Sequence, residues 1–289
     1  MTNSPALHAE SVSDYEEVGY SVADGVAVVT LNAPQRRNGM RVQMLVDVLD
    51  ALDRADRDPG VRAVIVTGAG ESFSVGADLD GPETLSRAIV EDVDGHTPTG
   101  YREPAGRISE RLFSMCKPVI AALNGHAIGG GATIAAAMDI RIASEDARFG
   151  FVFTRRGVVP EGASSWFLPR LVGVGRATDW ILSGRVFDAA EGLEAGYLTK
   201  VVPAGGVMAA AHEYAQIFVS ETSPTSVALS KRLLAGSWLH SHPGPAAAEE
   251  SRTYAGSVDS VDAREGVMSF LERRPAVFPP LNPSPAQRF

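Results

Sequence analysis

Cysteine and histidine are scarce in this 289-residue chain, which has one cysteine and six histidines. Cys116 alone cannot form an intramolecular disulfide, and a zinc site built from Cys and His ligands would have too few of them. The histidines also lack metal-binding spacing such as HExxH. We therefore expect a reduced protein with no structural disulfide and no metal.

Long apolar runs are missing as well. The longest fall well short of the roughly 18 residues that a membrane-spanning helix needs. Residues 1–20 are polar and acidic, without the apolar stretch of a secretory signal peptide. With the single cysteine, these absences predict a cytoplasmic protein without a membrane partner.

An excess of positive charge is also absent, because 26 Lys and Arg residues face 35 Asp and Glu residues and leave a formal net charge of −9. Binding to nucleic acid or to an anionic membrane is therefore not expected, although a local basic group could hold one phosphorylated small molecule. The apolar share of 45% and the charged share of 21% are ordinary globular values. This length suits one large domain or two.

Apolar runs typical of buried strands alternate with helical spacing over much of the first 150 residues. Strands are predicted at Val26–Leu31, Val61–Thr67, Val119–Leu123 and Asp139–Ala143, and helices at Arg41–Arg57 and Gly130–Met138. Such alternation indicates an α/β fold with a parallel sheet and helices outside it. Residues 81–110 show no clear period and are predicted to form a loop or short helices.

The composition changes near residue 205. Residues 1–14 are predicted to be a flexible arm, residues 15–205 the α/β core, and residues 206–289 an alanine-rich helical region. The clearest helices of that region are Val207–Ser220 and Asp262–Arg274. Helices collected at one end of an α/β chain usually pack on a neighbouring element or subunit, so this region is expected to serve oligomerisation.

The segment Ser72–Leu79, SFSVGADL, follows the second predicted strand. It is either a tight turn in which Asp78 caps a short helix, or a loop whose Ala77 N–H points into a pocket. The residues alone do not choose between these interpretations.

The segment Asn124–Ala132, NGHAIGGGA, places three glycines at a helix start. Each glycine costs the helix about 1 kcal/mol relative to alanine, so something should offset that cost. Close helix–sheet packing is one explanation. The other, which we favour, is close approach of a ligand whose developing oxyanion would use the exposed N–H groups.

Four ordered motifs support a family assignment: N-G-M at Asn38–Met40, GADL at Gly76–Leu79, KPVIAALNGHAIGGGA at Lys117–Ala132 and REGVMSFLERRPAVF at Arg264–Phe278. Together they resemble the crotonase, or enoyl-CoA hydratase/isomerase, superfamily. The resemblance implies a spiral of ββα repeats with a C-terminal helical trimerisation region, so a homotrimer or homohexamer is expected. It also implies an acyl-CoA thioester substrate whose enolate is stabilised by two backbone N–H groups. By motif position these belong to Ala77 and Gly130.

The same resemblance places further residues at the substrate. The loop residues expected to line its binding site are Gly39, Gly76, Asp78, Leu79 and Gly129. Arg36 and Arg37 are expected beside the nucleotide, where guanidinium groups bind phosphate well, although solvated charges are the usual explanation for such a cluster. Arg273 and Arg274 are a weaker second candidate.

The acid/base residues depart from the family pattern. The two positions at which typical hydratases carry glutamates hold Thr133 and Phe153 here, so these residues are expected to line the substrate pocket without transferring protons. Instead, Pro160-Glu161-Gly162 resembles a segment of some Δ3,Δ2-enoyl-CoA isomerases, whose glutamate shuttles the proton. Glu161 could alternatively be an acidic first-turn residue that faces a helix dipole.

These observations predict an enzyme that acts on the double bond of an enoyl-CoA through an oxyanion-stabilised enolate. Glu161 is the expected proton carrier, and isomerisation is expected to outrun hydration. No cofactor is expected beyond the CoA of the substrate. The alternatives are a true hydratase, another thioester reaction such as hydrolysis or decarboxylation, and a non-catalytic acyl-CoA-binding protein.

Overall fold

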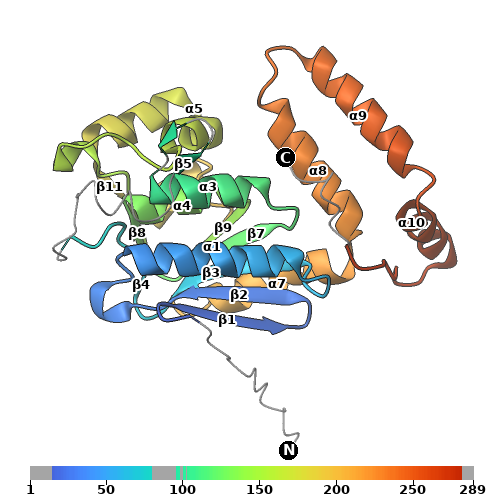
Figure 1. Ribbon diagram of the computed structural model, residues 1–289, viewed down its shortest axis with the longest axis horizontal. Helices are drawn as coiled ribbons and strands as arrows, with labels where there is room; N and C mark the ends of the chain where they lie inside the picture. The colour runs from blue at the N-terminus through green and yellow to red at the C-terminus, as the bar shows by residue number, and fades with distance from the viewer. Residues whose placement is uncertain (1–14, 80–95, 98–99, 102, 282–289) are drawn as a thin grey trace, which may run out of the picture.

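The computed structural model describes residues 15–79, 96–97, 100–101 and 103–281. The predicted arm at residues 1–14 and most of the 81–102 stretch lie outside these residues. No helix in the described part of the chain is both long and apolar enough to cross a membrane. Two sheets and the helices around them form the body of the molecule (Figure 1).

A six-stranded sheet in the order β1-β2-β3-β7-β9-β12 forms the centre of the fold. Its strands are β1 (Val18–Ala23), β2 (Val26–Leu31), β3 (Ala63–Gly68), β7 (Val119–Leu123), β9 (Ile140–Ser144) and β12 (Lys200–Val202). All neighbours are parallel except β1 and β2, which form an antiparallel hairpin. The predicted parallel α/β sheet is therefore confirmed.

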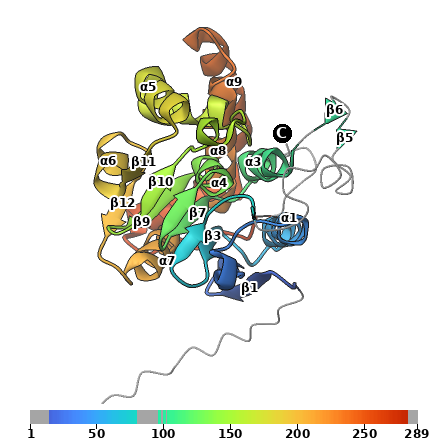
Figure 2. The same cartoon turned by 90° about the vertical axis from the view of Figure 1, so that its left-hand side faces the viewer.

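Successive residues of these strands face opposite sides of the sheet, and both sides are covered. In β7, Ile120 and Ala122 pack with α7 (Val207–Ser220), whereas Val119 and Ala121 belong to the larger core cluster on the other side. Helices α1 (Val42–Arg57) and α3 (Pro104–Ser114) cover that second side. Figure 2 shows α7 and the α1–α3 pair on opposite sides of the sheet. Burial on both faces explains why these strands are continuous apolar runs.

A smaller sheet in the order β11-β10-β8-β4 carries the two glycine-containing loops. Its strands are β4 (Ser72–Ser74), β8 (His126–Ile128), β10 (Arg148–Gly150) and β11 (Val186–Asp188). Because β4 and β8 are parallel, the loops that follow them leave the sheet at the same edge. The second of these loops leads directly into α4 (Gly130–Ala136).

Local periodicity located most of these elements to within two residues, with Val26–Leu31 and Val207–Ser220 matching throughout. Strand β1 was not predicted, because its Val, Gly, Tyr and Ser residues do not form an apolar run. Helix α3 begins inside the stretch where only a loop or short helices were expected. The short elements β5 (His96–Thr97), β6 (Gly100–Tyr101), η1 (Pro34–Arg36) and η2 (Thr154–Arg156) complete this half of the chain.

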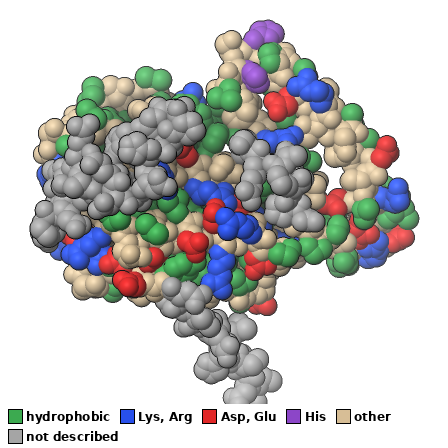
Figure 3. Space-filling view, viewed as in Figure 1, with side chains coloured by type: hydrophobic (Ala, Val, Ile, Leu, Met, Phe, Trp, Pro, Cys, Tyr) green, Lys and Arg blue, Asp and Glu red, His purple; other side chains and the backbone are tan. Residues whose placement is uncertain are grey.

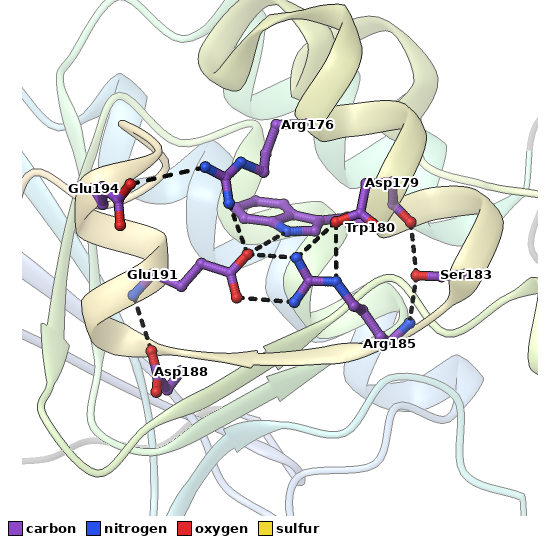
Figure 4. A network of polar contacts seen from close by, with 8 residues as sticks. All are labelled: Arg176, Asp179, Trp180, Ser183, Arg185, Asp188, Glu191 and Glu194. Carbon is purple, nitrogen blue, oxygen red and sulfur yellow. Dashed lines mark hydrogen bonds and ion pairs between the residues drawn. The ribbon is translucent and has the colours of Figure 1, made fainter.

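Helix α5 (Ser164–Ser183) is joined at its C-terminal end to α6 (Ala189–Glu194) by ionic contacts (Figure 4). The Glu191 carboxylate accepts hydrogen bonds from Trp180, Arg176 and Arg185, and the Arg185 bond is the largest cause that lowers the pKa of Glu191 to about 2. Asp188 caps the helix through the Glu191 N–H at 2.9 Å. These contacts hold the C-terminal end of α5 against α6.

The C-terminal helices extend away from the core (Figures 1 and 3). They are α8 (Pro224–Ser237), α9 (Pro243–Ser257) and α10 (Val261–Glu272). Lys231 of α8 donates to Asp139 at 2.7 Å, and the chain after α10 returns to the body, where Arg62 donates to the Phe278 carbonyl at 2.7 Å. Since α7 packs on the sheet, α8 to α10 form the part of the 206–289 region that lies apart from it.

Candidate active site

The two glycine-containing loops touch each other. A Cβ placed on Gly76 would lie 2.8 Å from the backbone nitrogen of Gly130, and Gly76 has a φ of +83°. Both the close approach and the left-handed backbone require a glycine at this position. The structure thus brings together the two loops that the sequence singled out separately.

The backbone around Ala77 is held by a single parallel bridge to Met40. The Met40 N–H donates to the Gly76 carbonyl at 2.7 Å, and the Asp78 N–H donates to the Met40 carbonyl at 3.1 Å. In this pattern the Ala77 N–H points away from Met40. Neither it nor the Gly130 N–H has a protein acceptor among residues 15–79 and 103–281. The two predicted donors are therefore available to an external oxygen.

Asn38, in the first motif, fixes this arrangement from behind. Its buried side chain accepts from the Ala33 N–H at 2.9 Å and donates to the carbonyls of Ala69 and Ser72 at 2.9 and 2.8 Å. Its own carbonyl accepts from the Ser74 hydroxyl at 2.8 Å. Asn38 therefore holds the Met40 segment beside the Ala77 loop, a role that sequence reasoning missed although the N-G-M motif contains this residue.

The three consecutive glycines have different reasons to be glycine. A Cβ on Gly131 would lie 2.3 Å from the Ser74 carbonyl oxygen, which is the close packing first considered as the alternative. Gly129 has a φ of +55°, and a Cβ there would meet open space. A Cβ on Gly130 would lie 2.9 Å from the Met40 methyl and 3.0 Å from a Glu161 carboxylate oxygen. Close packing therefore explains the glycine at position 131, whereas the glycines at positions 129 and 130 leave space at the start of α4.

Glu161 reaches this site from the turn before α5. The carboxylate oxygen beside Gly130 brings an ionisable group next to the helix end that carries one of the two available N–H groups. Burial is the larger cause that raises the pKa of Glu161 to about 7, and the negative charge of Glu103 adds to it. A carboxyl group that titrates near neutral pH can both take and return a proton.

Thr133 and Phe153 have different surroundings. Phe153 is 7% exposed and belongs to the main core cluster, so it packs against apolar side chains. Thr133, on the first turn of α4, is fully buried, yet its hydroxyl oxygen has no hydrogen-bond partner within the part of the chain that the structure describes. A buried hydroxyl without a partner costs about 1–3 kcal/mol, which a bound water or substrate oxygen would recover.

Glu103 is the site residue that sequence reasoning missed. It precedes α3, and its carboxylate accepts a hydrogen bond from the Gly162 N–H at 2.6 Å. It lies within the 81–110 stretch that showed no period. The only available signal was an acidic residue immediately before Pro104 at a helix start.

Arg36 and Arg37, the arginines predicted beside the nucleotide, differ in their contacts. Arg36 donates to the Gly39 carbonyl at 2.7 Å and forms ion pairs with Glu17 and with Asp78, the latter at 3.9 Å. Asp78 also pairs with Arg41 at 2.6 Å. Arg37 is exposed, in a left-handed conformation at the end of η1. Arg36 therefore holds the loop, whereas no such contact engages the exposed Arg37 side chain in the described part of the chain.

The remaining predicted residues lie at the surface of the molecule. Leu79, 54% exposed, follows the Ala77 loop at the surface. Arg274 is bound to Glu265 and Glu272, and Arg273 ends α10 in a left-handed conformation. No described contact brings either arginine to the glycine loops.

Residues 21–280 match the family model described as enoyl-CoA hydratase/isomerase. The chain belongs to the enoyl-CoA hydratase/isomerase family. One relative is an enoyl-CoA hydratase from Alternaria alternata, which is 38% identical over 87% of this chain and 82% of its own length.

Solved structures of other proteins share this fold. An enoyl-CoA hydratase from Bacillus anthracis superposes with a TM-score of 0.84 at 30% identity, covering 91% of this chain and 99% of that one. DspI from Pseudomonas aeruginosa superposes with a TM-score of 0.81 at 30% identity, over 92% and 99% of the two chains. The predicted crotonase fold and the enzyme family are therefore confirmed.

Proposed function

We propose that the protein moves protons on an enoyl-CoA thioester, with the Ala77 and Gly130 N–H groups on the thioester oxygen and Glu161 as the proton carrier. The observation that carries this proposal is the Glu161 carboxylate beside Gly130. It places an acid/base group next to an available N–H donor, which is what enolate chemistry requires.

The two N–H groups would act on the negative charge that develops on the thioester oxygen when a proton leaves C2. Loss of one such donor typically costs about 3–4 kcal/mol of transition-state stabilisation. Both donors are backbone groups held by strand pairing and by the start of α4, so they need no reorganisation during the reaction.

Double-bond isomerisation is the reaction that this arrangement serves with the fewest groups. Glu161 takes a proton from C2 of a 3-enoyl-CoA and returns it to C4, so the same carboxyl is base and then acid. A pKa near neutral suits both steps, because the protonated and ionised forms of Glu161 then have similar populations at neutral pH.

Hydration of a 2-enoyl-CoA is the second candidate. Hydration needs a base for the water and an acid for C2. A second carboxylate, that of Glu103, lies close enough to Glu161 for its charge to raise the pKa of Glu161. The unpartnered Thr133 hydroxyl offers a place for a water oxygen. The names of the Alternaria and Bacillus relatives also support hydration.

Rates on a 3-enoyl-CoA and on the matching 2-enoyl-CoA test the proposal. Glu161→Gln keeps the size and removes the titrating group, so both activities should fall by orders of magnitude while CoA-ester affinity stays nearly unchanged. The exposed Glu145→Gln is the matched control. An unaffected Glu161→Gln removes Glu161 from the mechanism, and a wild type without turnover would indicate a non-catalytic acyl-CoA-binding protein.

The ratio of the two wild-type rates separates the candidates. Faster conversion of the 3-enoyl-CoA supports isomerisation, whereas much faster addition of water to the 2-enoyl-CoA supports hydration. Release of free CoA would instead indicate thioester hydrolysis.

We also propose that the protein is a homotrimer or homohexamer assembled through α8 to α10. Large apolar side chains are exposed on and around these helices, among them Leu239 (75%), Tyr254 (69%), Val261 (69%), Phe270 (81%) and Leu271 (67%). So many exposed apolar side chains on one projecting region favour an interface between subunits. Light scattering should report an oligomer that Phe270→Asp/Leu271→Asp dissociates, and a monomeric wild type at micromolar concentration would contradict the assignment.

A further inference from the structure

The turn that carries Glu161 is tied to a distant segment of the chain. The Glu103 carboxylate accepts from the Gly162 N–H at 2.6 Å, although the two residues are 59 positions apart. Gly162 follows Glu161 directly, so this hydrogen bond sits on the backbone of the proposed proton carrier. A short hydrogen bond from an N–H to an ionised oxygen is among the stronger ones that proteins make.

The surroundings leave room for this contact. A Cβ on Gly106, in the first turn of α3, would lie 2.6 Å from the bonded oxygen of Glu103. A Cβ on Gly162 would lie 2.2 Å from the Thr133 methyl, and Gly162 has a φ of +61°. Two glycines thus allow the start of α3, the Glu161 turn and Thr133 of α4 to come together.

We propose that Glu103 is the positioning residue of Glu161: its carboxylate anchors the turn and places a second negative charge beside the proton carrier. This inference rests on the proposed function and extends it to a residue at neither of the usual glutamate positions of the family. Glu103 acts through Glu161.

Among the described residues, Glu103 is the charged group that acts on the pKa of Glu161. Of the side chains that the described contacts place around the Glu161 turn, those of Met40 and Thr133 are uncharged, and Gly130 has none. Burial is the first cause that raises the pKa of Glu161, and Glu103 is the charged group that adds to it. A like charge disfavours ionisation, so Glu103 keeps Glu161 protonated to a higher pH than burial alone would.

Two variants separate the anchor from the charge. In Glu103→Gln, the amide oxygen can still accept from the Gly162 N–H, but the negative charge is gone. In Glu103→Ala, both are lost. Glu145→Gln, on an exposed residue, removes one unit of charge elsewhere and serves as the control.

Direct titration of Glu161 is the primary measurement, because it does not depend on turnover. The carboxyl resonance of ¹³C-labelled glutamate that disappears in Glu161→Gln identifies the group, and its midpoint is then followed against pH. We expect the midpoint to move to lower pH in Glu103→Gln and to stay in place in Glu145→Gln. An unmoved midpoint in Glu103→Gln overturns the proposal.

Turnover supplies the second readout. In Glu103→Gln, the acidic limb of kcat/KM should move to lower pH with the midpoint. In Glu103→Ala, kcat should fall about 10- to 100-fold across the pH range, because small displacements of a reacting group cost this much. Full kcat in Glu103→Ala would overturn the anchoring role.

The two proposals fail in different ways. If Glu161→Gln keeps wild-type turnover, the proton-carrier role is wrong, whatever the titration of Glu103→Gln shows. If Glu161→Gln is inactive and the midpoint in Glu103→Gln does not move, the proton-carrier role stands and the positioning role of Glu103 is wrong.

Discussion

A carboxylate oxygen of Glu161 lies 3.0 Å from the position that a Cβ on Gly130 would occupy. The glycine therefore does more than expose a backbone N–H, because it also leaves the space that the carboxylate uses. One residue starts α4 and the other precedes α5, so the contact between these two helices determines the distance from the N–H donor to the proton carrier.

Glu161 should make the stability of the protein depend on pH in an unusual direction. Below its unfolded pKa of about 4.5 the carboxyl is protonated in both states, and above its folded pKa of about 7 it is ionised in both. Between these values only the folded protein keeps the proton, so the free energy of unfolding falls as pH rises. Glu161→Gln should therefore be more stable than wild type above pH 7, by roughly 1–3 kcal/mol.

Urea unfolding of wild type, Glu161→Gln and Glu145→Gln at pH 5 and pH 8 measures this effect. The gain of Glu161→Gln over wild type should be larger at pH 8, and Glu145→Gln should show no such difference. An equal effect at both pH values would mean that the Glu161 carboxyl titrates where an ordinary one does.

Gly130→Ala should remove activity and leave the protein folded. The new methyl meets the end of the flexible Met40 side chain at 2.9 Å and the Glu161 carboxylate at 3.0 Å, so both side chains must shift. The N–H remains, but the methyl occupies the space beside it and should keep the thioester oxygen from reaching it. We therefore expect kcat to fall by about 100- to 1000-fold, as when one oxyanion donor is lost. Gly175→Ala, whose Cβ meets nothing within 4 Å, is the matched control for glycine replacement. Near-normal turnover in Gly130→Ala would remove Gly130 from the oxyanion site.

Asn38→Ala should destabilise the protein and loosen the Ala77 loop. The substitution leaves the Ala33 N–H and two carbonyls without their buried partner, and alanine is less favoured than asparagine at a φ of +54°. The expected loss in the free energy of unfolding is roughly 2–4 kcal/mol. Chemical denaturation measures it against the exposed Asn32→Ala. Equal stability of the two variants would show that the Asn38 side chain does not hold these loops.

CoA binding should weaken with salt and depend more on Arg37 than on Arg36. Arg37 is exposed and near the predicted nucleotide position, whereas Arg36 is already engaged by Glu17 and the Gly39 carbonyl. Hydrogen bonds to charged groups contribute about 1.5–3 kcal/mol, so Arg37→Ala should raise the Kd about tenfold or more. Added salt should reduce the difference from wild type.

Calorimetric titration with CoA at low and high salt provides the measurement. The exposed Arg252→Ala, which lies on α9, controls for the loss of one positive charge. If Arg36→Ala/Arg37→Ala binds CoA as tightly as wild type at low salt, the phosphates bind elsewhere.

Local signals in the chain were enough for the order of strands and helices and for the family. Val26–Leu31 reads as a strand and Val207–Ser220 as a helix, because the apolar run and the helical spacing each lie within a single segment. Glu161 was also accessible as a candidate, since the P-E-G segment is a local pattern. The C-terminal apolar residues could be recognised as helical, but their exposure could not, because exposure depends on what packs against them.

Only the tertiary structure determined which groups meet. Glu103 lies within the 81–110 stretch without periodicity, and its bond to the Gly162 N–H links residues 59 positions apart. In the same way, the contacts of Arg36 with Glu17 and Asp78 separate it from Arg37, its neighbour in the chain. Contacts of this kind depend on how α3, α4 and the loop strands pack. Periodicity reports only how one segment distributes its own side chains, so the second carboxylate of the site could not be predicted from it.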